Sequence, residues 1–128
     1  MTLKIATVTI DCDDPAPIGR WWAEALAWEV TYEGDDEWVI EPPDGQNGLP
    51  LLFIKVPEKK TIKNRYHLDL RPGDRDAEVA RLEAMGATRA NVGQDPNAVT
   101  WVVMSDPFGN EFCVLRPLTA EEIAEGKT

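Results

Sequence analysis

Apolar and polar residues alternate from Leu3 to Cys12, and several of the apolar residues are β-branched. This pattern predicts a β-strand with one buried face. Directly after it, Asp13-Asp14-Pro15 offers a helix N-cap followed by a proline in the first turn. Apolar residues then recur at helical spacing, which predicts a helix; they are Ile18, Trp21, Trp22, Ala25 and Leu26.

Three further strand-like runs follow this helix, at residues 28–32, 37–41 and 49–56. The turn-forming segments Gly34-Asp35-Asp36 and Pro42-Pro43-Asp44-Gly45 separate them. The first part of the chain is therefore predicted to follow the order β-α-β-β-β.

The same order recurs about sixty residues later, and such a repeat decides the architecture. A strand is predicted over Arg65–Arg71, and a helix begins at Gly73-Asp74 and stops at Gly86. Strands near Ala87, Thr100 and Glu111 complete the second copy. We expect one domain over residues 1–128, built from two modules at about 3–56 and 65–116 and joined by a linker at 57–64.

Composition narrows the classes of protein that fit. The chain has 128 residues, is 43% hydrophobic and carries a net charge of −10, which disfavours nucleic acid as a partner. No apolar run is long enough to cross a bilayer, and no signal peptide is apparent, so we expect a cytoplasmic protein without a membrane partner. The two cysteines, Cys12 and Cys113, are predicted to be free thiols.

Basic residues concentrate between Lys55 and Arg71. Such a run is most often a solvated linker, which is our interpretation of Lys55, Lys59, Lys60 and Lys63. The alternative is a positive rim that attracts an anionic ligand. We keep this alternative for Arg65 and Arg71, which flank His67 and present planar donor groups suited to carboxylate or phosphate.

Period-two alternation assigns side chains to the two faces of each predicted sheet. Tyr66, Leu68 and Leu70 form the apolar face of the fifth strand. The opposite face is too polar to be buried on both sides, so we expect it to face water or a wet cavity. It carries Thr7, Thr9, Asp11, Arg65, His67, Asp69, Arg71, Glu111, Cys113 and Leu115.

Several residues on this face have alternative interpretations. His67 is either a hydrogen-bonded structural residue or an acid or base that titrates near neutrality. Cys113 is a nucleophile if His67 lies within hydrogen-bond reach, and otherwise a small apolar filler. Trp38 and Trp101 occupy equivalent places in the two modules and form either core or ligand-stacking walls.

The duplicated module, the Trp-rich first helix, the segment Asn64–Leu70 and the segment Asp106–Cys113 together resemble the vicinal oxygen chelate superfamily, and within it the glyoxalase-like group. The resemblance covers Leu3–Arg116. It implies an α+β fold in which two β-α-β-β-β modules form an incomplete mixed β-barrel, with helices outside and a central cleft. It also implies a homodimer.

In metal-dependent members of the superfamily, four strand positions supply ligands to a divalent ion. By position these fall on Thr7, on residues 51–53, on His67 and on Cys113, and only His67 is a standard ligand for such an ion. A register shift would bring Glu111 to the fourth position. His67 and Asp69, about 6 to 7 Å apart along one strand, are not expected to reach one ion together unless the strand has a bulge. We therefore predict no metal and no other cofactor, with a divalent metal as the alternative.

Three classes of function remain. The first is metal-independent binding of a small organic ligand, anionic or oxygen-rich, in the cleft. The second is a lyase or isomerase of the glyoxalase type that uses His67 or Glu111 as acid or base, with or without a metal. The third is an interaction module with a vestigial cleft. Binding is favoured, and the predicted ligand-binding residues are Arg65, Asp69, Arg71, Thr7, Thr9, Cys113 and Trp101.

Overall fold

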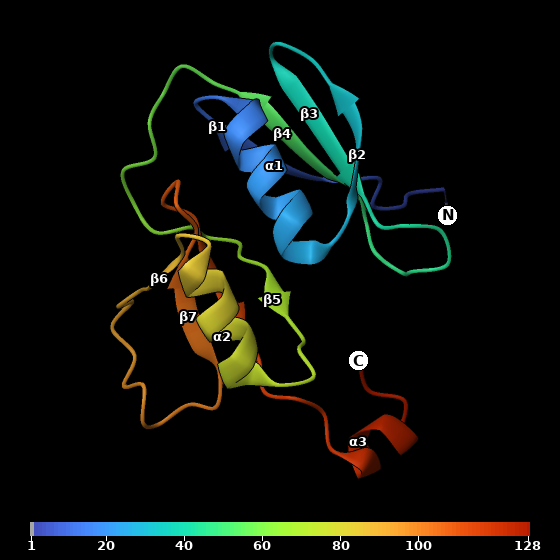
Figure 1. The fold of residues 1–128 in the computed structure, drawn as a ribbon, viewed down its shortest axis with the longest axis vertical. Coiled ribbons are helices and arrows are strands. Elements are labelled where there is room, and N and C mark those ends of the chain that lie inside the picture. The colour runs from blue at the N-terminus through green and yellow to red at the C-terminus, as the bar shows by residue number, and fades with distance from the viewer. Residues whose placement is uncertain (1) are drawn as a thin grey trace. The chain divides into compact units, whose positions relative to one another are not determined.

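A computed structural model describes residues 2–128, which fold as two compact units, with the division of the chain between Lys59 and Lys60. Each unit has the order β-α-β-β-β (Figure 1), and the second also carries a short terminal helix. The first unit consists of β1 (Val8–Cys12), α1 (Pro15–Leu26), β2 (Glu29–Glu33), β3 (Glu37–Glu41) and β4 (Leu51–Lys55). The second consists of β5 (Asp69–Leu70), α2 (Arg75–Ala84), β6 (Thr88–Arg89), β7 (Val102–Ser105), β8 (Glu111–Val114) and α3 (Ala120–Ala124).

The two sheets share one topology. Their strand orders are β1-β4-β3-β2 and β5-β8-β7-β6, and in each the first strand runs parallel to the last while the other pairs are antiparallel. The α+β class and the duplicated β-α-β-β-β module predicted from the sequence are therefore confirmed. No helix among residues 2–128 combines the length and the apolar character needed to cross a bilayer.

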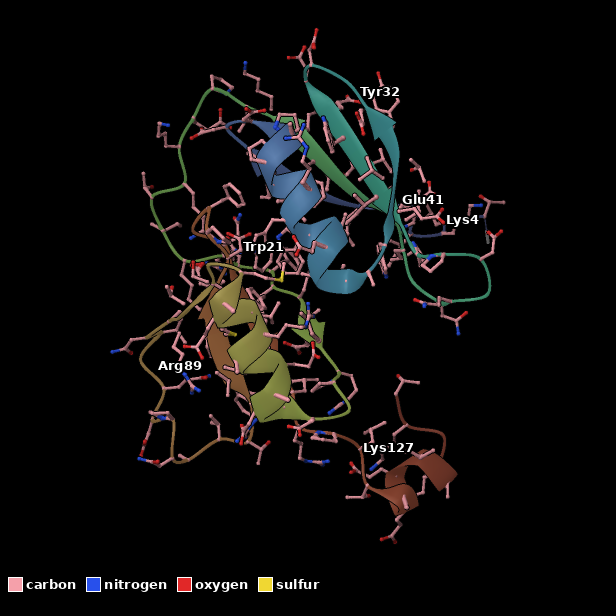
Figure 2. All side chains as sticks on the ribbon, in the orientation of Figure 1. Lys4, Trp21, Tyr32, Glu41, Arg89 and Lys127 are labelled. Carbon is pink, nitrogen blue, oxygen red and sulfur yellow. The ribbon has the colours of Figure 1, made fainter. Side chains whose placement is uncertain are left out.

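The core of the first unit lies between α1 and its sheet. Asp14 caps the helix by accepting a hydrogen bond from the Ala16 amide, and Ile18 and Trp22 are buried on the helix side. Trp38 on β3 is only 4% exposed and therefore belongs to the core, which was one of its two predicted roles. Tyr32 on β2 instead remains exposed at the far edge of the sheet (Figure 2).

The core of the second unit is smaller and follows the same plan. Val79 and Leu82 on α2 are buried, as are Met104 on β7 and Phe112 and Val114 on β8. Phe112 and Val114 alternate with Cys113, so the two faces of β8 carry different side chains. After the sheet, a capping box between Thr119 and Glu122 opens α3.

Three strands are shorter than predicted. β1 begins at Val8 rather than Leu3, β4 covers Leu51–Lys55 rather than residues 49–56, and β5 covers only Asp69–Leu70 rather than residues 65–71. The prediction that Tyr66 contributes to an apolar strand face is wrong, because its side chain is 94% exposed. Residues 65–68 lie outside the ladder, so the pleat that assigns alternate side chains to opposite faces does not operate there.

Gly19 allows the closest approach of α1 to β3. A Cβ atom added at this position would lie 2.8 Å from Cε3 of the buried Trp38 ring.

Alanine favours helix by about 1 kcal/mol over glycine, but overpacking of a core costs about 1 to 3 kcal/mol. We expect Gly19→Ala to lower the free energy of unfolding, measured by urea denaturation. Gly73→Ala is the control, since a Cβ there meets nothing within 4 Å; equal stability of the two variants would contradict the packing argument.

Candidate functional site

Three side chains of the second unit that can ligate a metal or bind a polar molecule converge at one point. Nε2 of His67 lies 3.1 Å from Oδ1 of Asp69. These two groups and the sulfur of Cys113 each offer one atom, and the three atoms lie within 4.8 Å of one another. We call His67, Asp69 and Cys113 the His67 cluster.

The parallel pairing of β5 with β8 builds this cluster. Asp69 stands opposite Cys113 in the register, and Leu70 stands opposite Val114. Because neighbours in register share a face, Asp69 and Cys113 lie on one side of the sheet while Leu70 and Val114 lie on the other. The buried Val114 belongs to the side on which α2 packs, so the cluster occupies the face away from α2.

The cluster corrects one expectation. His67 and Asp69 were predicted to be too far apart to reach one ion, since alternate residues of a strand are about 6 to 7 Å apart. His67 precedes β5, and its backbone is free of the strand geometry on which that estimate depends. Its imidazole therefore turns toward the carboxylate of Asp69.

Cys113 is a protonated thiol in this environment. Burial of the side chain, the charge of Asp69 and a hydrogen bond to its carboxylate together raise the pKa of Cys113 to about 11, and the positive charge of Lys63 opposes them in part. A thiol with this pKa contains little thiolate at neutral pH, and the thiolate is the nucleophilic form. The cluster therefore favours a packing and hydrogen-bonding role for Cys113.

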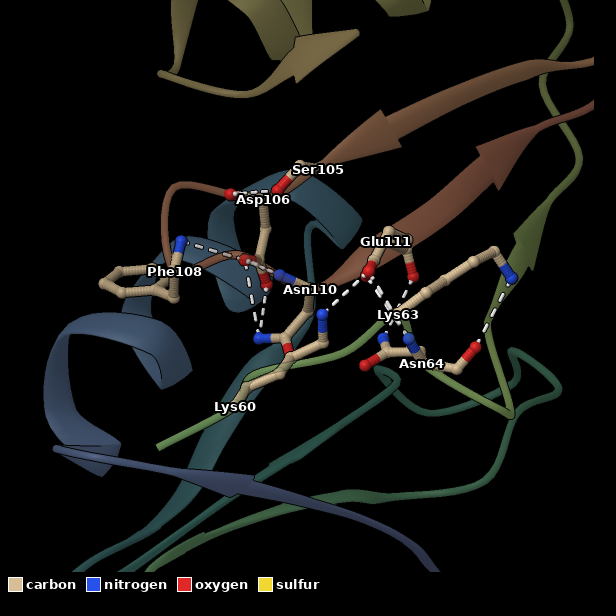
Figure 3. Close-up of polar contacts among 8 residues, drawn as sticks. All are labelled: Lys60, Lys63, Asn64, Ser105, Asp106, Phe108, Asn110 and Glu111. Atoms are coloured by element: carbon tan, nitrogen blue, oxygen red, sulfur yellow. Dashed lines mark hydrogen bonds and ion pairs between the residues drawn. The ribbon is translucent and has the colours of Figure 1, made fainter. Parts of the chain in front are cut away.

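A second group of polar contacts fastens the chain before His67 to β8 (Figure 3). The carboxylate of Glu111 forms an ion pair with Lys60 at 2.7 Å and accepts a hydrogen bond from the amide of Asn64 at 3.3 Å. The side-chain amide of Asn64 donates to the main-chain oxygen of Glu111, also at 3.3 Å. We call Lys60, Asn64 and Glu111 the Glu111 clasp.

The clasp sets the charge state of Glu111. Burial acts to raise its pKa, but the hydrogen bond and charge of Lys60 and the Asn64 amide outweigh burial and lower the pKa below the usual range. Glu111 is therefore an ionised carboxylate at neutral pH, which has no proton to donate.

The turn before β8 is fixed by the buried Asp106. Its carboxylate accepts hydrogen bonds from the amides of Phe108 and Asn110, each at 2.9 Å. These bonds close a turn over residues 106–110 and bring the chain into β8 at Glu111.

The other predicted ligand-binding residues lie outside the His67 cluster. Arg71 donates to the main-chain oxygens of Arg116 at 2.7 Å and Thr128 at 3.4 Å, while Arg65 lies exposed in a bend before His67. Trp101 donates to the side chain of Gln94 at 3.1 Å and so holds the loop before β7. Thr7 and Thr9 belong to the first unit, just before and within β1.

Sequence reasoning missed the roles of Lys63 and Asn64. Lys63 was assigned to a solvated linker, yet its charge acts on the thiol of Cys113. Asn64 belongs to the segment that carried the family resemblance, but nothing in the residue pattern showed that it bonds to β8. Both contacts depend on how residues 60–67 fold back onto the sheet, which a local pattern does not encode.

The His67 cluster meets the geometric requirement for a tetrahedral ion in part. Its nitrogen, oxygen and sulfur atoms are close enough to share one ion, and this mixed set suits zinc better than magnesium or manganese, which prefer oxygen. His67 and Cys113 occupy two of the ligand positions that the family resemblance implies, and Asp69 is an additional donor. A metal bound here would be held by these three residues and would act as a Lewis acid.

Removing the charge of Asp69 tests the electrostatics of the cluster. In a Cys12→Ser background, Asp69→Asn should lower the pKa of Cys113, because the charge and the hydrogen bond that oppose ionisation are lost. The rate of alkylation by iodoacetamide, followed against pH, should therefore rise at lower pH than in the parent. Asp44→Asn, which removes an exposed charge of the first unit, should leave the profile unchanged. Coincident profiles for Asp69→Asn and the parent would refute this account of the thiol.

Glu111→Gln tests whether the clasp holds residues 60–64 in place. The variant loses the ion pair with Lys60 and weakens the bond to Asn64, so this segment should open more often. We expect trypsin to cleave after Lys60 or Lys63 several-fold faster, as measured by mass spectrometry of early products. Glu33→Gln on β2 provides a control with the same change of charge, and equal cleavage of both variants would count against the clasp.

Comparison with known proteins places this geometry in a family. No curated protein sequence matches the chain. Among solved structures, the chain is similar to a glyoxalase/bleomycin resistance protein/dioxygenase family enzyme from Burkholderia phytofirmans, with 16% identity, a TM-score of 0.68 and coverage of 91% of this chain and 100% of the other. It is also similar to a mutant of the fosfomycin resistance protein FosX from Listeria monocytogenes, solved with Mn(II) and 1S,2S-dihydroxypropylphosphonic acid. That match has 12% identity, a TM-score of 0.69 and coverage of 98% and 99%.

A third similar structure is a bleomycin resistance determinant encoded on transposon Tn5. It has 15% identity and a TM-score of 0.59, and covers 91% of this chain and 100% of the other. At these identities the structures show a common fold. The family model for the glyoxalase-like domain matches residues 7–115, which include both modules and the whole His67 cluster. The chain therefore belongs to the glyoxalase-like domain family.

Proposed function

We propose that this protein binds a small, oxygen-rich organic molecule at the His67 cluster and does so without a metal ion. The observation that carries the proposal is the state of Cys113. At a position where metal-dependent relatives are expected to place a ligand, this chain has a buried thiol that is protonated at neutral pH and hydrogen-bonded to Asp69.

The cluster offers hydrogen-bonding groups to such a molecule. His67 and Asp69 are partly exposed, with 39% and 50% of their side chains accessible. An imidazole and a carboxylate together supply a donor and acceptors, which suit hydroxyl and carbonyl groups. The sulfur of Cys113 adds a polarizable contact beside them.

A metal-dependent enzyme is the second candidate, and the convergence of three ligating atoms favours it. In that case a thiophilic ion such as zinc would bind at the cluster with loss of the thiol proton. The FosX structure with Mn(II) shows that one protein of this fold is found with a divalent ion.

For this chain we also propose a homodimer, which size-exclusion chromatography with light scattering tests.

Metal content separates the two candidates. We expect protein purified without chelator to contain zinc, nickel, manganese and iron at well below one ion per chain, as measured by elemental analysis. Excess EDTA should leave the melting temperature unchanged, because removal of an ion that binds only the folded state would lower it. His67→Ala, which deletes the imidazole ligand, serves as the matched variant.

Stoichiometric metal that disappears in His67→Ala would refute metal independence and make the enzyme the leading candidate. Ligand binding is then tested in the metal-free protein with a panel of small acids, diols and aromatic compounds. A panel without any saturable binding, in protein with and without added zinc, would favour the interaction module instead.

A further inference from the structure

We propose that Lys63 is the cationic anchor for an oxyanion group, carboxylate or phosphate, of the molecule that binds at the His67 cluster. This inference rests on the proposed function and deepens it by naming the substrate class. It also departs from the expectation that Arg65 and Arg71 supply the charge. The argument rests on where Lys63 is held and on which neighbouring charges are already paired.

The Glu111 clasp determines the position of Lys63. The main-chain and side-chain amides of Asn64 both donate hydrogen bonds to Glu111. Glu111 lies on β8, two residues before Cys113. The side chain of Lys63 points away from the Glu111 carboxylate, and its ammonium donates to the main-chain oxygen of Asn64 at 3.4 Å (Figure 3). Lys63 is therefore attached to the segment that leads directly into His67.

Three neighbouring cations are already bonded, whereas the exposed Arg65 forms no ion pair within residues 2–128; of the two unpaired cations, it is Lys63 whose charge acts on the Cys113 thiol. Lys59 forms an ion pair with Asp13 at 2.7 Å, and Lys60 forms one with Glu111 at the same distance. Arg71 donates hydrogen bonds to two main-chain oxygens near the C-terminus. Within residues 2–128, Lys63 forms no ion pair with a carboxylate, and its single hydrogen bond leaves donors of the ammonium available.

The ammonium also lies within electrostatic range of the cluster. Burial and the charge of Asp69 keep the thiol of Cys113 protonated, whereas the charge of Lys63 acts in the opposite direction on the same sulfur. Asp69 is itself in contact with the imidazole of His67. An anion at this point would therefore meet an unpaired lysine beside an acid that already has a partner, in a protein whose net charge is −10.

The experiment uses two simple probes, inorganic phosphate and acetate, which separate the two sources of an oxyanion. His67 is the single histidine of the chain, so its imidazole C–H signal in NMR reports on the cluster without overlap. Each probe is titrated at pH 8 and constant ionic strength. We expect a saturable shift of the His67 signal with at least one probe, and weaker binding as salt is raised.

Variants then show which cation binds the probe. Lys63→Met should weaken binding of that probe by about threefold to fivefold, the range for a partly exposed charge pair, whereas Lys63→Arg should retain binding. Lys59→Met and Arg71→Met remove the same charge from groups that are already bonded, and should stay near the wild-type affinity.

Two outcomes overturn the assignment: an unsaturable response of His67 to both probes, with and without added zinc, or equal affinities in wild type and Lys63→Met. The proposed function fails separately. If the wild type responds only after zinc is added, metal independence is refuted, while Lys63 remains the anchor provided that Lys63→Met weakens the zinc-dependent response.

Discussion

The parallel pairing between the first and the last strand is the constraint on which each unit depends. In the first unit it sets Thr9 opposite Leu52, and in the second it sets Asp69 opposite Cys113. A parallel pair cannot be closed by a tight turn, so the helix and the two intervening strands must cross over before the last strand returns. The same crossover that puts a helix on one face of the sheet thus leaves the other face open for polar side chains.

Much of the fold could be predicted from the sequence because the strong patterns coincide with regular backbone. The helical spacing of Ile18 and Trp22 and the N-cap at Asp14 are features of the chain itself, and both recur in α1. Alternation was a sound guide along β8, where Phe112 and Val114 are buried beside α2. It misled at Tyr66, because a period of two has meaning only where a neighbouring strand holds the backbone extended.

The members of the candidate site could be named from the sequence, but the contacts outside the strands could not be predicted. Asp69 and Cys113 follow from the repeat and from the register that it imposes. The contact between His67 and Asp69, and the fastening of Asn64 to Glu111, arise where the chain leaves regular structure. In such segments the conformation is decided by a few specific hydrogen bonds between residues distant in sequence, and composition says little about which of them form.

The brevity of β5 has a consequence for how the site behaves over time. Asp69–Leu70 is an edge strand of two residues. The amide of Cys113 on β8 donates to the main-chain oxygen of Leu68, and the amide of Leu115, just after β8, donates to that of Leu70. An edge with so few bonds opens at a lower free energy than the core of the sheet, so its amide protons exchange with solvent through local fluctuations. A molecule that bridges His67 and Cys113 would hold the edge closed. Ligand binding at the site and local opening of β5 are therefore coupled, and each shifts the equilibrium of the other.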